Sequence, residues 1–356
     1  MKIGFILPDF RGGGAERVFI TLINYYFRNG IDVLLIVSTN NGPLKDYIDP
    51  GVEVIETGIY GVKSCLKIRD IVVKKDLTVL TGTLNMAYVV SLLTPFLPKT
   101  CKTVARIGNT ITEDLKNHSG MKKLIQSLYQ YVLILSDEIV VQSEYMKNDL
   151  ISFIGFNKIE GKVHLIYNPI DFIKVDRLSL EKDLPHEFIS GEDIVVVGRL
   201  ERQKDHKTSI LAFQEYTHIY GNSKLHILGE GSLHSEIKSF VNLLGLGDKV
   251  IFHGHISNPY PFIKNAKMLI MSSLYEGFSN VLLEAIYLKT PVVVSDCPGG
   301  NSEIVENGIN GYLFETGNSI DMADKMKCID EHDLLGSSAD EFNVSVIASK
   351  YINLFN

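Results

Sequence analysis

Residues 268–285 read MLIMSSLYEGFSNVLLEA. The stretch opens with a short apolar run, continues through a polar loop at 274–279 and ends with the apolar spacing of a helix. A buried strand that leads through a loop into a helix is the repeating unit of parallel sheets covered by helices. The stretch therefore predicts an α/β fold with polar groups at the carboxyl end of a strand.

Similar β-branched runs recur along the whole chain, separated by segments of helical length. In the first half the predicted strands are 2–7, 32–37, 52–55, 78–81, 102–107, 138–142 and 163–167. In the second half they are 193–198, 224–229, 249–254, 268–273, 291–296 and 311–314. Predicted helices include 15–28, 86–93 and 122–135. This alternation predicts two doubly wound, Rossmann-like domains that face a central cleft.

A chain of 356 residues is long enough for two domains. The polar, poorly periodic segment 174–193 indicates the linker between them. We expect an N-terminal domain at 1–172 and a C-terminal domain at 173–340. Residues 341–356 contain a last apolar-striped helix, which needs another surface to cover it. We expect this helix to pack back on the N-terminal domain.

The composition excludes several classes of protein. Hydrophobic residues make up 45% and charged residues 22%, which is typical of a globular protein rather than a disordered or coiled-coil one. The net charge of −7 argues against a general nucleic-acid binder. Residues 1–172 carry 19 basic against 17 acidic groups, and residues 173–356 carry 16 against 25. The two halves therefore differ in charge, at +2 and −9.

The cysteines and the N-terminus indicate a cytoplasmic protein. Cys65, Cys101, Cys297 and Cys328 lie far apart and lack metal-ligand spacing, so we expect reduced thiols. The N-terminal segment lacks the features of a signal peptide. The uncharged segment 77–98 is interrupted by glycine and proline, so it predicts a buried strand and helix rather than a membrane span.

Glycines follow the first predicted strand. Gly13 and Gly14 precede a helix, where they could let the backbone approach an anion, although a tight turn explains them equally well. After the first strand of the second half, Gly198 and Arg199 are followed by Lys204. Two cations directly after a buried strand suit a diphosphate, because together they can neutralise it without a metal; ordinary surface charge is the alternative.

Two carboxylates follow the predicted strand 268–273: Glu276 in the loop and Glu284 on the first turns of the next predicted helix. Ser279 or Asn280 can cap the helix that follows, so the amides of 278–281 would form a cradle for an anion. Ionised carboxylates only accept hydrogen bonds, which suits a ligand rich in hydroxyl groups. The alternative is a surface acid together with an acid favoured by the helix dipole.

These motifs closely resemble the retaining glycosyltransferases of family 4, which have the GT-B fold. The resemblance rests on EGFSNVLLEA at 276–285 and VGRLERQKD at 197–205, and it extends to GGGAERV, NPID, LGEGSLHSEI, VIFHGHI and PVVVSDCPGGNSEIVENGINGYLF. It implies transfer of a hexose or N-acetylhexosamine from a nucleotide diphosphate-sugar, with a UDP-sugar expected, and retention of anomeric configuration. The family reaction is usually described as front-face attack, with the leaving phosphate accepting the proton of the acceptor.

The resemblance also implies roles for individual residues. Arg199, Lys204 and Glu276 would be catalytic, with the two cations on the diphosphate and Glu276 on the transferred sugar. Glu284 would bind the ribose, and the backbone around His255 and Ile256 would contact the base. The remaining donor contacts would be Gly13, Gly14, Gly198, Gly277, Phe278, Ser279, Asn280 and Val281.

One position departs from the family pattern. Many relatives have a histidine after the strand that corresponds to 102–107, whereas this chain has Asn109. Asn109 can contact a sugar or acceptor hydroxyl, but it cannot act as an acid or base. His118 follows in a polar loop and is given no role.

No Asp-x-Asp pair occurs in the sequence, so we expect no metal and no cofactor. Segments 61–75 and 99–123 each carry a net charge of +4, which suits anionic lipid headgroups or a lipid diphosphate and peripheral contact with the cytoplasmic face of a membrane; solvated helix faces are the alternative. The resemblance to enzymes of polysaccharide biosynthesis implies a lipid-linked saccharide acceptor. Two other functions stay open: a nucleotide-sugar epimerase of the same fold, and a sugar-nucleotide-binding protein without catalysis.

Overall fold

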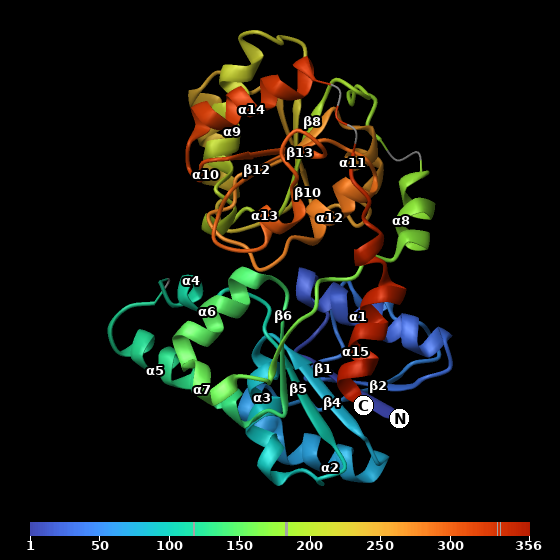
Figure 1. The fold of residues 1–356 in the computed structure, drawn as a ribbon. Helices are drawn as coiled ribbons and strands as arrows, with labels where there is room; N and C mark the ends of the chain where they lie inside the picture. Colours follow the sequence, from blue (N-terminus) through green and yellow to red (C-terminus); the bar gives the residue numbers. More distant parts are fainter. Residues whose placement is uncertain (117, 182–183, 333, 335) are drawn as a thin grey trace. The chain divides into compact units, whose positions relative to one another are not determined.

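The computed structural model describes residues 1–116, 118–181, 184–332, 334 and 336–356, which form two compact units (Figure 1). The first unit contains residues 1–169 and 341–356, and the second contains residues 170–340. The division falls three residues before the expected one at 172 and 173. The reason is that helix α8 (Phe172–Ser179) belongs to the second unit.

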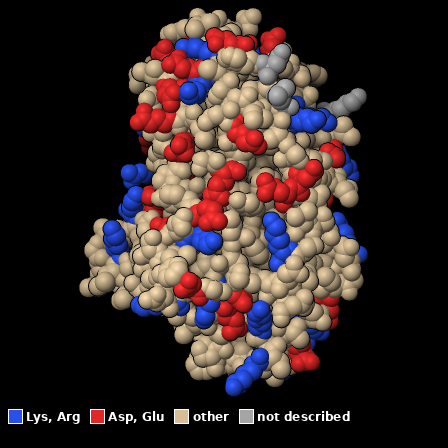
Figure 2. Space-filling model, viewed as in Figure 1, with Lys and Arg blue, Asp and Glu red and all other residues tan. Residues whose placement is uncertain are grey.

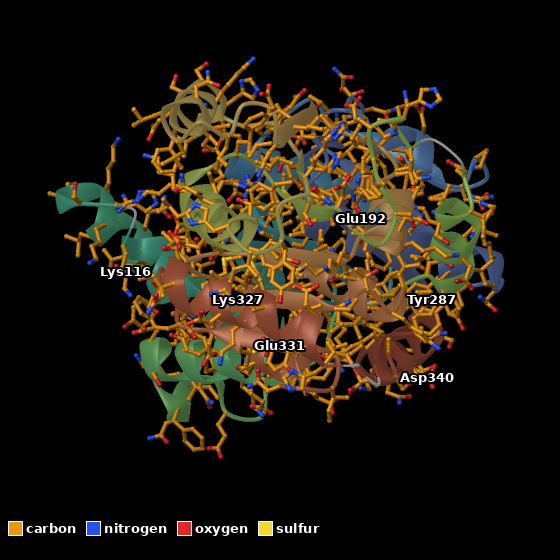
Figure 3. All side chains as sticks on the ribbon, turned by 90° about the horizontal axis from the view of Figure 1, so that it is seen from above. Lys116, Glu192, Tyr287, Lys327, Glu331 and Asp340 are labelled. Carbon is orange, nitrogen blue, oxygen red and sulfur yellow. The ribbon has the colours of Figure 1, made fainter. Side chains whose placement is uncertain are left out.

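Helix α8 corrects the prediction of a linker that begins at residue 174. Its N-cap is Asp171, whose side chain accepts a hydrogen bond from the amide of Lys174. The Phe172 ring stacks on Tyr287 of the second unit at 4.0 Å, and the Tyr287 hydroxyl donates to Asp176 at 2.8 Å (Tyr287 is labelled in Figure 3). Within the expected linker, residues 182 and 183 lie outside the described residues.

The first unit is built on a seven-stranded sheet of order β3-β2-β1-β4-β5-β6-β7, in which neighbouring strands are parallel. The strands are β1 (Lys2–Leu7), β2 (Asp32–Val37), β3 (Glu53–Glu56), β4 (Val79–Thr83), β5 (Lys102–Arg106), β6 (Glu138–Val141) and β7 (Val163–Leu165). The helices are α1 (Gly14–Arg28), α2 (Cys65–Lys75), α3 (Asn85–Leu93), α4 (Ile111–Lys116), α5 (Gly120–Gln130), α6 (Glu144–Ile154), α7 (Phe156–Ile159) and α15 (Val344–Phe355).

Helix α15 packs against α1 in the first unit. Buried residues of α15, such as Ile347 and Tyr351, share one apolar cluster with Phe5 of β1 and Tyr26 of α1. The Tyr26 hydroxyl donates to the carbonyl of Ala348 at 2.8 Å. The last segment of the chain therefore completes the core of the unit that the chain begins.

The second unit is built on a six-stranded parallel sheet of order β10-β9-β8-β11-β12-β13. The strands are β8 (Ile194–Val197), β9 (Leu225–Leu228), β10 (Val250–Gly254), β11 (Met268–Met271), β12 (Val292–Ser295) and β13 (Gly311–Phe314). Besides α8, the helices are α9 (His206–Thr217), α10 (His234–Leu243), α11 (Tyr260–Asn265), α12 (Asn280–Tyr287), α13 (Asn301–Ile304) and α14 (Ser319–Glu331). Because β8 and β11 are neighbours, the loops that follow them meet at one edge of the sheet.

The uncharged segment 77–98 forms the buried strand β4 and the largely buried helix α3, as predicted. Among the described residues, none of the helices has the length and apolar character needed to span a bilayer. On the face shown in Figure 2, acidic side chains predominate over the second unit, while lysines and arginines are more frequent over the first. This distribution follows the charges of −9 and +2 counted in the sequence.

Candidate active site

The loop after β8 carries the two cations that the sequence pattern assigned to a diphosphate. Arg199 is exposed, whereas the side chain of Lys204 is only 18% exposed. Lys204 ends a short 3-10 helix, Arg202–Lys204, and its methylene chain passes over Gly198. A Cβ on Gly198 would lie 3.6 Å from that chain, which is ordinary contact. The glycine and the two cations therefore belong to one compact loop.

Glu276 lies in the loop after β11, next to β8 in the sheet, and is buried. The Lys204 ammonium contacts its Oε1 atom at 2.5 Å, and the Ser273 hydroxyl donates to the same atom at 2.6 Å. Removing one partner of a buried ion pair is costly, because the remaining charge is left without compensation. The contact thus fixes the positions of two residues that are 72 positions apart in the sequence.

Backbone contacts hold the same two loops together. The amide of Leu274 donates to the carbonyl of Gln203 at 2.8 Å, and the side-chain amide of Gln203 donates to the carbonyl of Tyr275 at 2.9 Å. Lys204 directly follows Gln203, and Glu276 directly follows Tyr275. The chain itself thus sets the geometry of the ion pair, which is what electrostatic preorganisation requires.

Two glycines allow neighbouring loops to approach this pair. A Cβ on Gly229, after β9, would lie 1.9 Å from the carbonyl oxygen of Gly198. A Cβ on Gly299, after β12, would lie 2.1 Å from the carbonyl oxygen of Glu276. Both glycines also have a positive φ, at +149° and +141°. Gly229 and Gly299 therefore allow the neighbouring loops to close around the ion pair.

Glu284 lies in α12 and is buried. Ser279, one of the two residues expected to cap this helix, is its N-cap and accepts a hydrogen bond from the amide of Leu282 at 3.4 Å. The Tyr260 hydroxyl, which is also buried, donates to Oε1 of Glu284 at 3.1 Å. The second carboxylate is therefore held in place by a phenol from α11.

The other predicted contacts of the second unit lie on the same edge of the sheet. The loop before α12 and its first turn contain Gly277, Phe278, Ser279, Asn280 and Val281. His255 and Ile256 directly follow β10, and His255 is exposed with its amide donating to the Glu230 carboxylate at 3.3 Å. The structure thus brings the predicted donor contacts of this unit to the carboxyl ends of β8, β10 and β11.

Three predicted contacts belong to the first unit. Gly13 is the N-cap of α1, Gly14 begins it, and the Glu16 carboxylate folds over the turn, 2.3 Å from where a Cβ of Gly13 would lie. A carboxylate of the chain itself thus lies where the sequence pattern allowed an anion to bind. Asn109, after β5, donates from its side chain to Asp114 at 2.8 Å.

The pairing of Asn109 with Asp114 places a titratable group beside the position of the family histidine. Burial raises the pKa of Asp114 to about 6, although the hydrogen bond from Asn109 and the charge of His118 act in the opposite direction. This carboxyl group could not be predicted from the sequence, because nothing in the spacing shows that Asp114 turns back toward Asn109.

Sequence reasoning also missed Ser273, Gln203 and Tyr260, the residues that position the two glutamates. His206, another omission, is buried under the Arg199 loop, and its Nε2 contacts the carbonyl of Arg199 at 3.0 Å. Burial lowers the pKa of His206 to about 4, so the ring is neutral at pH 7 and donates from Nε2. Single polar residues outside a recognised pattern carry little signal of their own, so only the fold identifies these positions.

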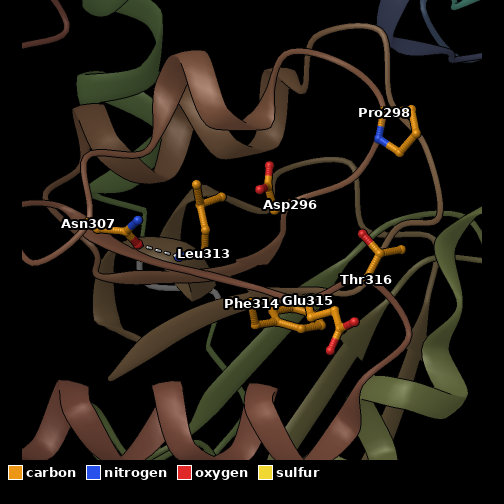
Figure 4. Close-up of a pocket in the computed structure, with 7 residues that line it drawn as sticks. All are labelled: Asp296, Pro298, Asn307, Leu313, Phe314, Glu315 and Thr316. Atoms are coloured by element: carbon orange, nitrogen blue, oxygen red, sulfur yellow. Dashed lines mark hydrogen bonds between the residues drawn. The ribbon is translucent and has the colours of Figure 1, made fainter.

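A pocket of about 660 Å³ lies in the second unit near the ends of β12 and β13 (Figure 4). Its lining residues are Asp296, Pro298, Asn307, Leu313, Phe314, Glu315 and Thr316. None of the predicted site residues lines it, and its two carboxylates would repel a diphosphate.

Among the described residues, no three His, Cys, Asp or Glu side chains are grouped so that they could hold a metal ion.

Comparison with known proteins agrees with this architecture. Residues 12–173 match the family described as Glycosyltransferase Family 4, and residues 185–332 match the family described as Glycosyl transferases group 1. The structure of Anabaena HepE in complex with UDP has a TM-score of 0.78 to this chain, with 19% identity over 99% of both chains. Two parallel sheets with this likeness define the GT-B class of fold.

Two relatives come from Campylobacter jejuni. One, named N-acetylgalactosamine-N,N'-diacetylbacillosaminyl-diphospho-undecaprenol 4-alpha-N-acetylgalactosaminyltransferase, is 32% identical over 60% of this chain and 55% of its own length. The other, named GalNAc-alpha-(1->4)-GalNAc-alpha-(1->3)-diNAcBac-PP-undecaprenol alpha-1,4-N-acetyl-D-galactosaminyltransferase, is 23% identical over 92% of this chain and 89% of its own. The chain spans about half the length of the first curated relatives that it matches. It belongs to the family 4, or group 1, glycosyltransferases.

Proposed function

We propose that this chain is a retaining glycosyltransferase that moves a hexose or N-acetylhexosamine from a UDP-sugar to a lipid-linked saccharide. The observation that carries the proposal is the partly buried contact between Lys204 and Glu276. It places a cation suited to a diphosphate beside a carboxylate suited to sugar hydroxyls. The UDP bound to Anabaena HepE makes UDP-sugars the first donors to test.

The chemistry follows from the charges on these side chains. When the bond between the anomeric carbon and the diphosphate oxygen breaks, negative charge accumulates on the leaving UDP. The Lys204 ammonium has three N–H donors, so it can bind a phosphate oxygen while it keeps its contact with Glu276. The acceptor oxygen bonds to the anomeric carbon from the same face, and its proton passes to the leaving phosphate. Arg199 adds a second cation on the diphosphate.

Lipid linkage of the acceptor is supported by the Campylobacter relatives, whose names specify undecaprenol diphosphate substrates. The basic segments of the first unit give weaker support than the sequence suggested. Arg106, counted in segment 99–123, is 1% exposed and contributes nothing to the surface. Lys116 of the same segment pairs with Glu113 (Lys116 is labelled in Figure 3). The four cysteines are free thiols. A cytoplasmic location stays a prediction.

The decisive experiment is a panel of UDP-sugars, each incubated with the protein with and without a lipid-linked saccharide, while free UDP and the product are followed. Transfer with a retained anomeric configuration supports the proposal. Conversion of the donor into an epimer without acceptor would indicate the epimerase. Tight binding of UDP without turnover of any donor would indicate the binding protein.

Chelation is expected to leave the activity unchanged. The proposed site neutralises the diphosphate with Arg199, Lys204 and helix amides, so its transition state needs no divalent cation. The measurement is the rate of UDP release in EDTA against the rate in added Mg²⁺ or Mn²⁺. Activity that disappears in EDTA and returns with either ion would contradict the metal-independent part of the proposal.

A further inference from the structure

Helix α5 presents its apolar face to solvent. The side chains of this face recur at helical spacing, and each is between 54% and 70% exposed. They are Met121, Leu124, Ile125 and Leu128. The only fully buried residue of the helix is the polar Gln130.

The other side of α5 contacts the first unit through polar and aromatic groups. The Tyr88 hydroxyl of α3 donates to the side-chain oxygen of Gln130, and the Tyr129 ring stacks on Tyr88 at 4.6 Å. A surface helix of a globular protein normally turns its apolar stripe toward the core. Helix α5 is oriented the other way, and an exposed apolar stripe of this kind marks a surface that binds a partner or a membrane.

The stripe continues beyond the helix and is bordered by positive charge. Tyr131 and Leu135, three and seven positions after Leu128, are 38% and 42% exposed. The ammonium of Lys158 lies 5.2 Å from the centroid of the Tyr131 ring. Residues 119–135 contain Lys122 and Lys123, both exposed, and no acidic residue.

We propose that α5 docks the protein on an anionic membrane, with the apolar stripe in the headgroup region and the lysines on lipid phosphates. An amphipathic helix with exposed leucines, basic neighbours and an adjoining tyrosine has the chemistry of an interfacial helix. The positive charge complements anionic lipid, whereas a second copy of this chain would bring like charges together. The inference rests on the lipid-linked acceptor of the proposed function, because such an acceptor is held in a membrane.

The test compares two double variants with matched chemistry. Leu124→Ser with Ile125→Ser removes the centre of the stripe. Leu243→Ser with Ile173→Ser removes one leucine and one isoleucine of the second unit that are even more exposed, at 82% and 84%. We expect the first variant to bind phosphatidylglycerol–phosphatidylethanolamine vesicles about tenfold or more weakly than the wild type, and the second to bind like the wild type. Both should unfold at the wild-type urea concentration, because exposed substitutions change stability little.

The charges are tested separately. Lys122→Glu with Lys123→Glu should weaken binding to the same vesicles at low salt, and the difference should shrink at high salt, because exposed charges are screened. Pure phosphatidylcholine vesicles should bind the wild type more weakly than the anionic ones do. Equal binding to both kinds of vesicle would contradict the role of the lysines.

Three outcomes would overturn the proposal: no binding of the wild type to anionic vesicles, equal loss in both serine variants, or a dimer that dissociates in the α5 variant while vesicle binding is unchanged. UDP binding by calorimetry separates this proposal from the proposed function. It should be equal in all variants, because α5 contains none of the predicted donor contacts. A wild type that binds vesicles but no UDP would refute the proposed function and leave the docking surface intact.

Discussion

Lys204→Ala is expected to lower kcat by about 10²–10³-fold, or about 3–4 kcal/mol of transition-state stabilisation. Lys204 is the less exposed of the two cations of the site, and its ammonium group is already held by Glu276. Removing it takes a positive charge away from the leaving diphosphate and takes the cation away from the Glu276 carboxylate, which keeps its hydrogen bond from the Ser273 hydroxyl. Steady-state rates of UDP release with a lipid-linked acceptor measure the effect.

The structural part of this effect can be separated from the catalytic part. Lys204→Ala should also reduce the free energy of unfolding, because it leaves a buried carboxylate without its cation. Adding Glu276→Gln to Lys204→Ala should recover part of that stability and none of the activity. Arg199→Ala offers the matched comparison. It should cost on the order of 2–4 kcal/mol of transition-state stabilisation. Because Arg199 is exposed, the free energy of unfolding should stay unchanged. Rates within a few-fold of wild type for both single variants would contradict the diphosphate assignment.

The sheets could be predicted from the sequence because buried parallel strands carry a strong signal. Runs such as 194–197 and 292–294 are uninterrupted β-branched residues, and both are fully or nearly buried in the sheet. Helix α8 was missed for the opposite reason. Its eight residues carry exposed as well as buried apolar side chains, and its place against Tyr287 depends on a residue more than 100 positions away.

The individual residues of the site could be predicted, but their contacts could not. The Lys204 and Glu276 motifs were each visible in the sequence as polar groups after a strand. Their ion pair depends on β8 and β11 being neighbours, and a strand order of this kind cannot be read from periodicity. The same limit explains why Arg106 was wrongly counted as part of a basic surface. A count of charges in one segment does not show which side chains are buried. The contacts of Arg106 come from Thr83 and Asn168, which lie in distant parts of the chain.

Arg106 is a buried cation at the end of β5. Its guanidinium donates to the Thr83 hydroxyl at 3.0 Å and to the Asn168 side-chain oxygen at 2.6 Å, while its Nε atom has no hydrogen-bond partner among the described residues. Burial lowers the pKa of Arg106, and the nearby Tyr351 phenol acts in the opposite direction. Helix α15 thus supplies both apolar surface and a polar neighbour for a buried charge.

Tyr351→Ala is therefore expected to lower the free energy of unfolding by about 3–5 kcal/mol, the cost of removing a fully buried aromatic side chain. Tyr351→Phe keeps the ring and should cost much less than Tyr351→Ala, because it removes only the hydroxyl, which has no hydrogen-bond partner among the described residues. Val346→Ala, on the exposed side of the same helix, is the control and should stay within about 0.5 kcal/mol of wild type. Urea unfolding followed by circular dichroism measures all three. If Tyr351→Ala were as stable as Val346→Ala, α15 would contribute nothing to the folded core of the first unit, and its contacts with α1 would be incidental.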